Sequence, residues 1–220
     1  MNSLLEKLLQ SPDIQLVIDQ AKAVLWEEKK KRQEFYKWLK PDVKAEFING
    51  EIVMHSPVKR RHLDASDNLN RLLSIFVDKQ QLGICSTEKA LISLTRNDYE
   101  PDICFWNNEK ASVFNGDTML HPAPDFIVEI LSKGTAKRDR GVKFQDYAAH
   151  GIKEYWIVDA KKQLIEQYVL TDITAKEYEL LKKYTIEDTI ESIAVTGFTI
   201  PIAAIFDKAR NLEVLALMLQ

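Results

Sequence analysis

The stretch from residue 126 to residue 131 reads Phe-Ile-Val-Glu-Ile-Leu and is apolar at every position except Glu129. A short apolar run of this kind is typical of a strand buried on both faces of a sheet. An ionised carboxylate in such a strand is costly unless it is paired with a cation or binds a metal. A contribution to stability does not account for Glu129 at this position, so Glu129 is the first candidate for a functional residue.

A second apolar run follows after a helical stretch. Residues 154–159 read Glu-Tyr-Trp-Ile-Val-Asp, and residues 135–150 before them have helical character, with Gly151 as a C-terminal stop. A strand, a helix and a further strand in this order predict a crossover between parallel strands.

An Asn-Gly dipeptide at positions 49 and 50 predicts a two-residue hairpin turn, with Ile48 opposite Glu51 and Glu46 opposite Val53. A helix is expected over residues 62–80. Further strands are expected at residues 84–94, 102–106, 164–170, 178–184, 192–195 and 198–202, with a turn at residues 96–98. These elements predict an α/β fold with a mixed central β-sheet flanked by helices.

The first 40 residues predict a helical extension to this domain. Ser11 is the expected N-cap and Pro12 the first helical residue, and apolar residues recur at helical spacing from Ile14 to Leu25. The charged run at residues 27–34 is typical of a solvated helical face. We therefore expect an extension over residues 1–40 and a single domain over residues 41–220.

Composition restricts the possible functions. The chain has 220 residues, 45% of them apolar, and a formal net charge of −3, so any nucleic-acid binding must come from local basic patches. Its two cysteines, Cys85 and Cys104, lie in predicted strands without the spacing of a zinc site and are expected to be reduced thiols. No membrane span or signal segment is recognisable, so we expect a cytoplasmic protein.

Three residues form the candidate catalytic set: Asp102 at the start of one strand, Glu129 in the next, and Lys143 on the helix that follows. We expect Asp102, Glu129 and the backbone carbonyl of Ile130 to bind Mg²⁺ (or Mn²⁺), which would activate water for phosphodiester hydrolysis. Lys143 would stabilise charge on the phosphoryl oxygens. Asp139 and Tyr147 lie four residues to either side of Lys143 and share its helical face.

Each member of this set also has a plainer explanation. Glu129 could form a buried ion pair with Lys143 or an arginine. Asp139 and Lys143 have the spacing of an ordinary surface pair, and a Pro-Asp dipeptide such as the one ending at Asp102 commonly starts a turn or strand.

Two basic clusters are candidates for nucleic-acid binding. Lys59, Arg60 and Arg61 precede His62 at the expected start of a helix, where backbone N–H groups favour phosphate. A second cluster follows the strand that contains Glu129 and consists of Lys133, Lys137, Arg138 and Arg140. Each cluster taken alone could be ordinary solvated surface. Glu46 on the hairpin and His62 are possible auxiliary residues of the site.

The chain resembles the PD-(D/E)XK nuclease superfamily, and more closely a large bacterial family of restriction-endonuclease-like proteins that is abundant in cyanobacteria. The resemblance covers about residues 35–205. It rests on residues 46–53, Ser56-Pro57 with His62, Pro101-Asp102-Ile103, residues 128–132, Asp139 with Lys143 and Tyr147, and residues 151–159. It implies a restriction-endonuclease-like core and a magnesium-dependent phosphodiesterase site at Asp102 and Glu129.

The sequence departs from the superfamily signature at one position. The signature has a lysine two residues after the second acid, where this chain has Leu131. Lys143 would then be a migrated catalytic lysine. We expect a metal-dependent DNA endonuclease that acts as a homodimer, because cutting a duplex breaks two phosphodiester bonds. A nuclease-fold module that binds nucleic acid or protein without cutting, and an assembly protein acting through the N-terminal helix, are the alternatives.

Overall fold

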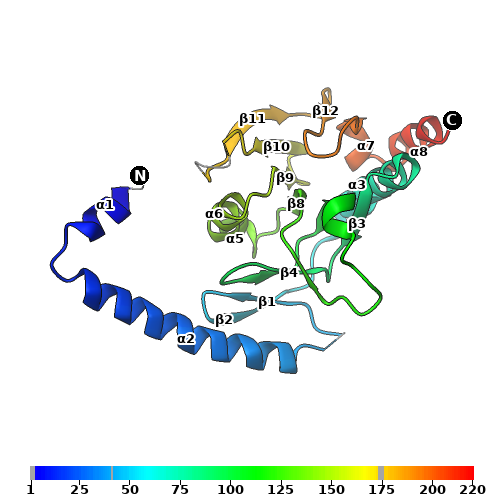
Figure 1. Cartoon of the computed structure of the whole chain (residues 1–220). Helices are drawn as coiled ribbons and strands as arrows, with labels where there is room; N and C mark the ends of the chain where they lie inside the picture. Colours follow the sequence, from blue (N-terminus) through cyan, green and yellow to red (C-terminus); the bar gives the residue numbers. More distant parts are fainter. Residues whose placement is uncertain (1–2, 41, 173–175) are drawn as a thin grey trace. The chain divides into compact units, whose positions relative to one another are not determined.

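The computed structural model describes residues 3–40, 42–172 and 176–220. The chain folds into two compact units (Figure 1). The first contains residues 1–55 and 95–99, and the second contains residues 56–94 and 100–220. Residue 41, the predicted boundary between extension and domain, lies outside the described residues.

The first unit combines the N-terminal helices with a small antiparallel sheet. Its elements are α1 (Ser3–Leu9), α2 (Ile14–Trp38), β1 (Ala45–Ile48), β2 (Glu51–Met54) and β5 (Asp98–Tyr99), with strand order β2-β1-β5. The predicted hairpin register is confirmed, since Ile48 pairs with Glu51 and Glu46 with Val53. The turn residues at positions 49 and 50 adopt φ angles of 51° and 82°, as a type I′ turn requires.

Helix α2 begins two residues later than the predicted first helical residue. Asp13 is its N-cap and Ile14 its first residue. Ser11 instead closes the preceding turn: its hydroxyl accepts the N–H of Asp13 at 3.3 Å, and its carbonyl accepts that of Ile14 at 3.2 Å. The prediction of Ser11 as N-cap with Pro12 in the helix is therefore wrong, because the serine hydroxyl closes a local turn before the helix.

Two members of the charged run at residues 27–34 pair with the 95–99 segment of the same unit. Arg32 donates to both carboxylate oxygens of Asp98, at 2.6 Å and 2.5 Å. Arg96 donates to both oxygens of Glu28, at 2.8 Å and 2.7 Å. The remaining residues of the run are exposed, as predicted for a solvated helical face.

The second unit is built on a six-stranded sheet with the order β11-β10-β9-β8-β6-β3. Its strands are β3 (Gly83–Thr87), β6 (Ile103–Asn107), β8 (Phe126–Ile130), β9 (Glu154–Asp159), β10 (Leu164–Val169) and β11 (Glu179–Tyr184). Strands β8 and β9 are parallel and the other pairs are antiparallel. The predicted mixed sheet and the predicted crossover are both confirmed.

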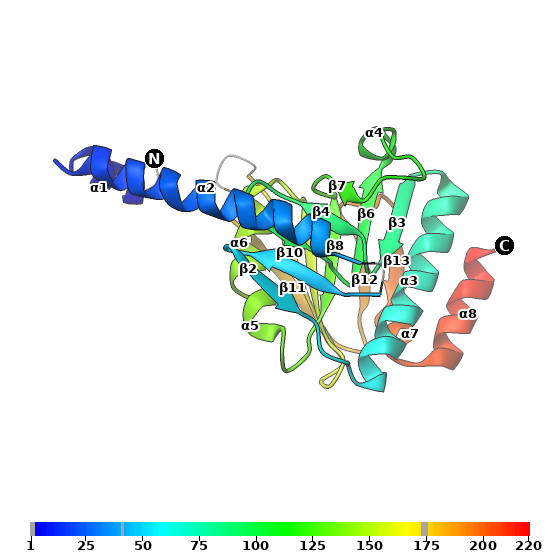
Figure 2. The ribbon, with the colours of Figure 1, turned by 90° about the horizontal axis from the view of Figure 1, so that it is seen from below.

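Helices lie on both faces of this sheet (Figures 1 and 2). One face packs against α3 (Arg60–Gln80), α7 (Ala203–Phe206) and α8 (Lys208–Met218), around a core that includes Leu69, Phe105, Phe126 and Trp156. Figure 2 shows α3 beside α8, where Arg71 donates to Asn211 at 2.6 Å. The helices α5 (Ala136–Asp139) and α6 (Val142–Ala149) cover the other face, on which Glu129 lies.

The remaining elements of the second unit are short. They are β4 (Leu91–Ser93) and β7 (Leu120–His121), which pair in parallel, α4 (Asn108–Ala111), and the antiparallel pair β12 (Thr189–Glu191) and β13 (Thr199–Pro201). Among the described residues, no helix is long and apolar enough to cross a membrane.

Three further predicted elements differ from the structure. The predicted strand over residues 84–94 is divided into β3 and β4, because Glu88 and Lys89 adopt positive φ angles of 43° and 54°. The predicted strand at 192–195 is a turn, in which the Ser192 hydroxyl and the Ala194 N–H donate to buried Glu154 at 2.6 Å and 2.8 Å. The single helix expected over residues 135–150 is broken into α5 and α6 at Gly141.

Candidate active site

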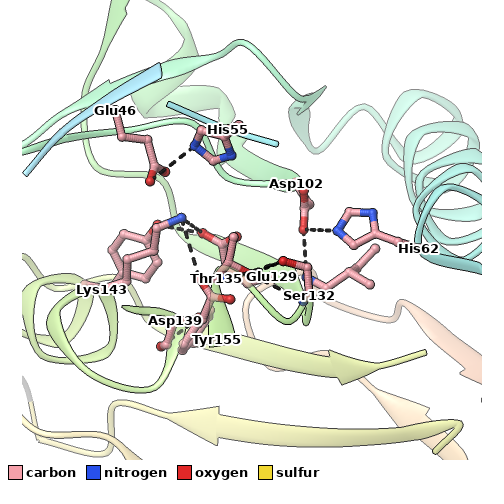
Figure 3. A network of polar contacts seen from close by, with 12 residues as sticks. Glu46, His55, His62, Asp102, Glu129, Ser132, Thr135, Asp139, Lys143 and Tyr155 are labelled. Carbon is pink, nitrogen blue, oxygen red and sulfur yellow. Dashed lines mark hydrogen bonds and ion pairs between the residues drawn. The ribbon is translucent and has the colours of Figure 1, made fainter. Parts of the chain in front are cut away.

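Glu129 is held by two donors from helix α6 (Figure 3). Its Oε1 accepts a hydrogen bond from Lys143 Nζ at 2.8 Å and another from the Tyr147 hydroxyl at 2.9 Å. All three side chains are buried. The ion pair considered from the sequence is therefore present, and Lys143 reaches the carboxylate despite the break at Gly141.

Asp139 completes this group on the helical side. Its Oδ1 lies 3.7 Å from Lys143 Nζ, so the ammonium stands between two carboxylates, as Figure 3 shows. The turn before α5 is closed by Ser132 and Thr135, whose hydroxyls lie 3.0 Å apart. Asp139 is fully buried, so the Asp139–Lys143 pair is an internal one rather than the surface pair that its spacing alone suggests.

Asp102 is held from two other directions. Its Oδ2 accepts the backbone N–H of Ile130 at 2.8 Å and lies 3.2 Å from Nε2 of His62 (Figure 3). The Asp102 carbonyl also accepts the N–H of Glu88 at 3.2 Å. His62 occupies the first turn of α3, and within the described part of the chain its Nδ1 has no hydrogen-bond partner. His62, which the sequence predicts only as an auxiliary residue, thus directly contacts Asp102, a candidate metal ligand.

Asp102 stands one residue before β6, and Glu129 lies within the neighbouring strand β8. Strands β6 and β8 pair in antiparallel register with Ile103 opposite Val128, and one further step along this register would bring Asp102 opposite Glu129. Residues directly opposite each other in an antiparallel pair have their side chains on the same face, with Cβ atoms about 5 Å apart. On this register the two carboxylates share one face of the sheet, and the Glu129 carboxylate contacts the ammonium of Lys143.

These residues fit a small divalent cation. Magnesium binds through one or two carboxylates and keeps several waters, and the side chains of Asp102 and Glu129 are ligands of this type. Among the described residues, no group of three or more His, Cys, Asp and Glu side chains is placed to hold a metal ion. The carbonyl of Ile130 stays a predicted ligand, whereas its N–H binds Asp102.

The auxiliary and basic residues are placed as follows. Glu46 belongs to the first unit, where its Oε2 lies 3.3 Å from Nε2 of His55. Lys59 is the N-cap of α3, and Lys59, Arg60 and Arg61 are all exposed. The second cluster lies on α5 and at its two ends: Lys133, Lys137 and Arg140 are exposed, and Arg138 is half-buried. Two of these arginines have acidic partners, because Arg60 lies 2.7 Å from Asp64 and Arg140 pairs with Glu166.

One residue of the site is not recognisable from the sequence. The hydroxyl of Tyr155 on β9 donates to the backbone carbonyl of Asp139 at 3.1 Å. Burial, together with the negative charges of Glu129 and Asp139, raises the pKa of Tyr155 well above its ordinary value, so the hydroxyl stays a donor. In the sequence Tyr155 belongs to an apolar strand, and no signal separates it from a core residue.

The two cysteines are free thiols, as predicted. Cys104 is buried and Cys85 half-buried, on the adjacent strands β6 and β3. Burial raises the pKa of the Cys85 thiol to about 12, which makes it a poor nucleophile at neutral pH.

Comparison with known proteins agrees with this architecture. A structure of a "putative nuclease belonging to DUF820" from Anabaena variabilis superposes with a TM-score of 0.66 at 17% identity, covering 79% of this chain and 96% of that one. This likeness supports the fold alone. A protein of Synechocystis sp., the uncharacterized protein sll1609, is 29% identical over 127 residues, which are 57% of this chain and 71% of the relative.

The family comparison covers most of the chain. Residues 32–203 match the Uma2 family, whose description is "Putative restriction endonuclease". The predicted resemblance to restriction-endonuclease-like proteins and the predicted α/β fold class are therefore confirmed. With its mixed sheet and the matched region spanning both Asp102 and Glu129, this chain belongs to the Uma2 family of restriction-endonuclease-like proteins.

Proposed function

We propose that this protein is a metal-dependent endodeoxyribonuclease in which Asp102 and Glu129 bind Mg²⁺ or Mn²⁺ and Lys143 is the catalytic lysine. The observation that carries the proposal is the hydrogen bond of 2.8 Å between Lys143 Nζ and Glu129 Oε1. It brings the Lys143 ammonium from helix α6 to Glu129, the acid that is followed two residues later by Leu131 at the signature position. The family membership supports the same class of reaction.

The side chains of the site would have the following roles in the proposed hydrolysis. When bound, the cation would supply Lewis-acid polarisation of the phosphate and a more acidic water. The Lys143 ammonium would stabilise negative charge on the phosphoryl oxygens, and Tyr147 would keep Glu129 oriented through its 2.9 Å hydrogen bond. His62 and the Ile130 N–H would orient Asp102, because both contact its Oδ2.

DNA is the proposed substrate. The exposed side chains of Lys59 and Arg61 stand at the N-terminus of α3, a 21-residue helix, where the helix dipole and free N–H groups add to the attraction for phosphate. Lys133 and Lys137 flank the start of α5. We further propose that the protein acts as a homodimer on duplex DNA, which sedimentation of the free protein and of its DNA complex would test.

Plasmid cleavage tests the proposal. The wild-type protein is incubated with supercoiled plasmid and Mg²⁺ or Mn²⁺, beside Asp102→Asn, Glu129→Gln and Lys143→Met. Glu187→Gln, at an exposed carboxylate, is the matched control. We expect nicked and linear products from the wild type and the control, and a loss of at least about 100-fold in each of the three site variants. Equal cleavage by all five proteins would mean that the activity has another source.

A non-cleaving module is the second candidate. It is favoured by one observation: Glu129 is already paired within the chain, with Lys143 and Tyr147, and a buried pair of this kind can be purely structural. This alternative predicts DNA binding without product at any metal concentration, and binding that persists in Glu129→Gln.

A further inference from the structure

We infer that Asp139 is a positioning residue that receives the Lys143 ammonium when a divalent cation binds to Glu129. The starting point is the position of Nζ, which lies 2.8 Å from Glu129 Oε1 and 3.7 Å from Asp139 Oδ1. The nearer carboxylate is hydrogen-bonded and the farther one is within ion-pair distance only. The ammonium therefore stands between two carboxylates and favours the one that is the proposed metal ligand.

The inference rests on the proposed metal site. A cation that binds Glu129 competes with Lys143 for the same carboxylate, and the two positive charges repel each other. Lys143 is 1% exposed, so it cannot simply move its charge into water. Moving a buried ammonium away from a carboxylate costs free energy, and a second carboxylate within reach offsets this cost.

Asp139 has the rigidity that such a role needs. Its N–H donates to the Thr135 carbonyl at 3.0 Å, and its own carbonyl accepts the Tyr155 hydroxyl at 3.1 Å. These bonds anchor the backbone of Asp139 to the turn before α5 on one side and to strand β9 on the other. The backbone that carries this carboxylate is thus fixed, while Lys143, with four rotatable side-chain bonds, can move between the two acids.

The break between the two helices separates the two partners. Asp139 ends α5 and Lys143 stands in the first turn of α6, with Gly141 as the N-cap between them. A Cβ at Gly141 would lie 2.8 Å from the carbonyl oxygen of Lys137, so glycine allows this close approach. Asp139 and Lys143 therefore belong to two different short helices, yet their side chains still meet as they would at this spacing on one helix.

Binding of Mn²⁺, followed by the loss of its free-ion electron paramagnetic resonance signal, tests the inference without any cleavage. We expect the wild type to bind Mn²⁺ and Asp139→Asn to bind it about tenfold more weakly. In this variant the Lys143 ammonium has no carboxylate at position 139 to pair with when it leaves Glu129. Asp139→Glu keeps the charge and should return the affinity to within about threefold of wild type. Lys143→Met removes the competitor and should bind Mn²⁺ more tightly than wild type.

The double variant separates positioning from general damage to the fold. In the Lys143→Met background, Asp139→Asn should change the Mn²⁺ affinity by less than about threefold, since no ammonium remains to be received. The same tenfold loss in both backgrounds would overturn the inference, as would wild-type affinity in Asp139→Asn or weaker binding by Lys143→Met. Wild-type protein that binds no Mn²⁺ would instead overturn the proposed metal site itself, and the inference with it.

Discussion

The imidazole of His62 lies 3.2 Å from the carboxylate of Asp102, measured from Nε2 to Oδ2, and both side chains are buried. This contact joins the first turn of α3 to the start of β6, so one side of the candidate metal site depends on a helix 40 residues earlier in the chain. Partners that orient a metal ligand commonly affect affinity or activity by 10-fold to 100-fold when they are removed.

We therefore expect His62→Ala to raise the Mg²⁺ concentration needed for half-maximal cleavage by about 10-fold or more. The Ile130 N–H would remain as a partner of Asp102, so activity should be recovered in part at high Mg²⁺. Asp67→Ala, at an exposed position of the same helix, controls for effects on α3. An unchanged Mg²⁺ dependence in His62→Ala would show that the contact has no part in the reaction.

The basic residues at the start of α3 should determine how steeply DNA binding falls with salt. Each lost phosphate contact reduces the slope of log K against log salt by about 0.9. In the Glu129→Gln background, Lys59→Ala with Arg61→Ala should reduce the slope by up to about 2, while Arg60→Ala should have a smaller effect because Arg60 is paired with Asp64. Fluorescence anisotropy measures the slope.

The matched control for this experiment is Lys161→Ala with Lys162→Ala, two exposed lysines between β9 and β10. Their removal changes the net charge by the same amount and should leave the slope unchanged. If both double variants reduce the slope equally, binding follows the total charge of the protein and the α3 cluster is ordinary surface.

Gly141→Ala should destabilise the protein and move Lys143. The added Cβ would meet the Lys137 carbonyl oxygen at 2.8 Å, and relief of such a contact by a backbone shift typically costs about 1–3 kcal/mol. Gly116→Ala is the control, since a Cβ there meets nothing within 4 Å. Urea unfolding measures the change, and a Gly141→Ala protein as stable as the control would contradict the steric argument.

The contribution of Asp125 to stability should depend on pH. Burial alone would raise its pKa, but the Asn107 N–H and the ammonium groups of Lys110 and Lys153 outweigh burial and lower the pKa below the ordinary value of 3.8. A lowered pKa in the folded state stabilises the protein above pH 3.8, and this contribution is lost as the pH falls through the folded-state pKa.

The free energy of unfolding should therefore differ most between wild type and Asp125→Asn at neutral pH. The difference should stay constant down to about pH 5 and then shrink below pH 3.8. Urea unfolding at a series of pH values measures it. A difference that does not change between pH 7 and pH 3 would contradict the role of the two lysines.

The central strands and the hairpin could be predicted from the sequence because their signals are local. The apolar run of β8 needs no partner to be recognised, and the Asn49-Gly50 turn fixes its own register. Helices α7 and α8 could not be predicted in this way. In α8 only Asn211 and Val214 are buried, while Leu212 and Leu217 are exposed, so its apolar residues do not form a clear inward face.

The residues of the candidate site likewise differ in whether the sequence reveals them. Glu129 is recognisable because its surroundings are apolar, and Lys143 because it keeps the helical spacing from Asp139 across the break. The contacts of His62 and Tyr155 are invisible in the sequence. Each depends on how a helix end approaches a strand far away in the chain, which no pattern of neighbouring residues encodes.

The antiparallel register of β6 and β8, which would set Asp102 opposite Glu129, also bears on how this family can change in length. An insertion of one residue inside β6 or β8 would turn one of the two carboxylates to the opposite face of the sheet. The connection between the two strands, residues 108–125, contains only α4, β7 and turns, and a change in its length leaves the register of Ile103 and Val128 intact. Insertions and deletions among relatives should therefore gather between the two acids, and the spacing from each acid to the end of its own strand should stay constant.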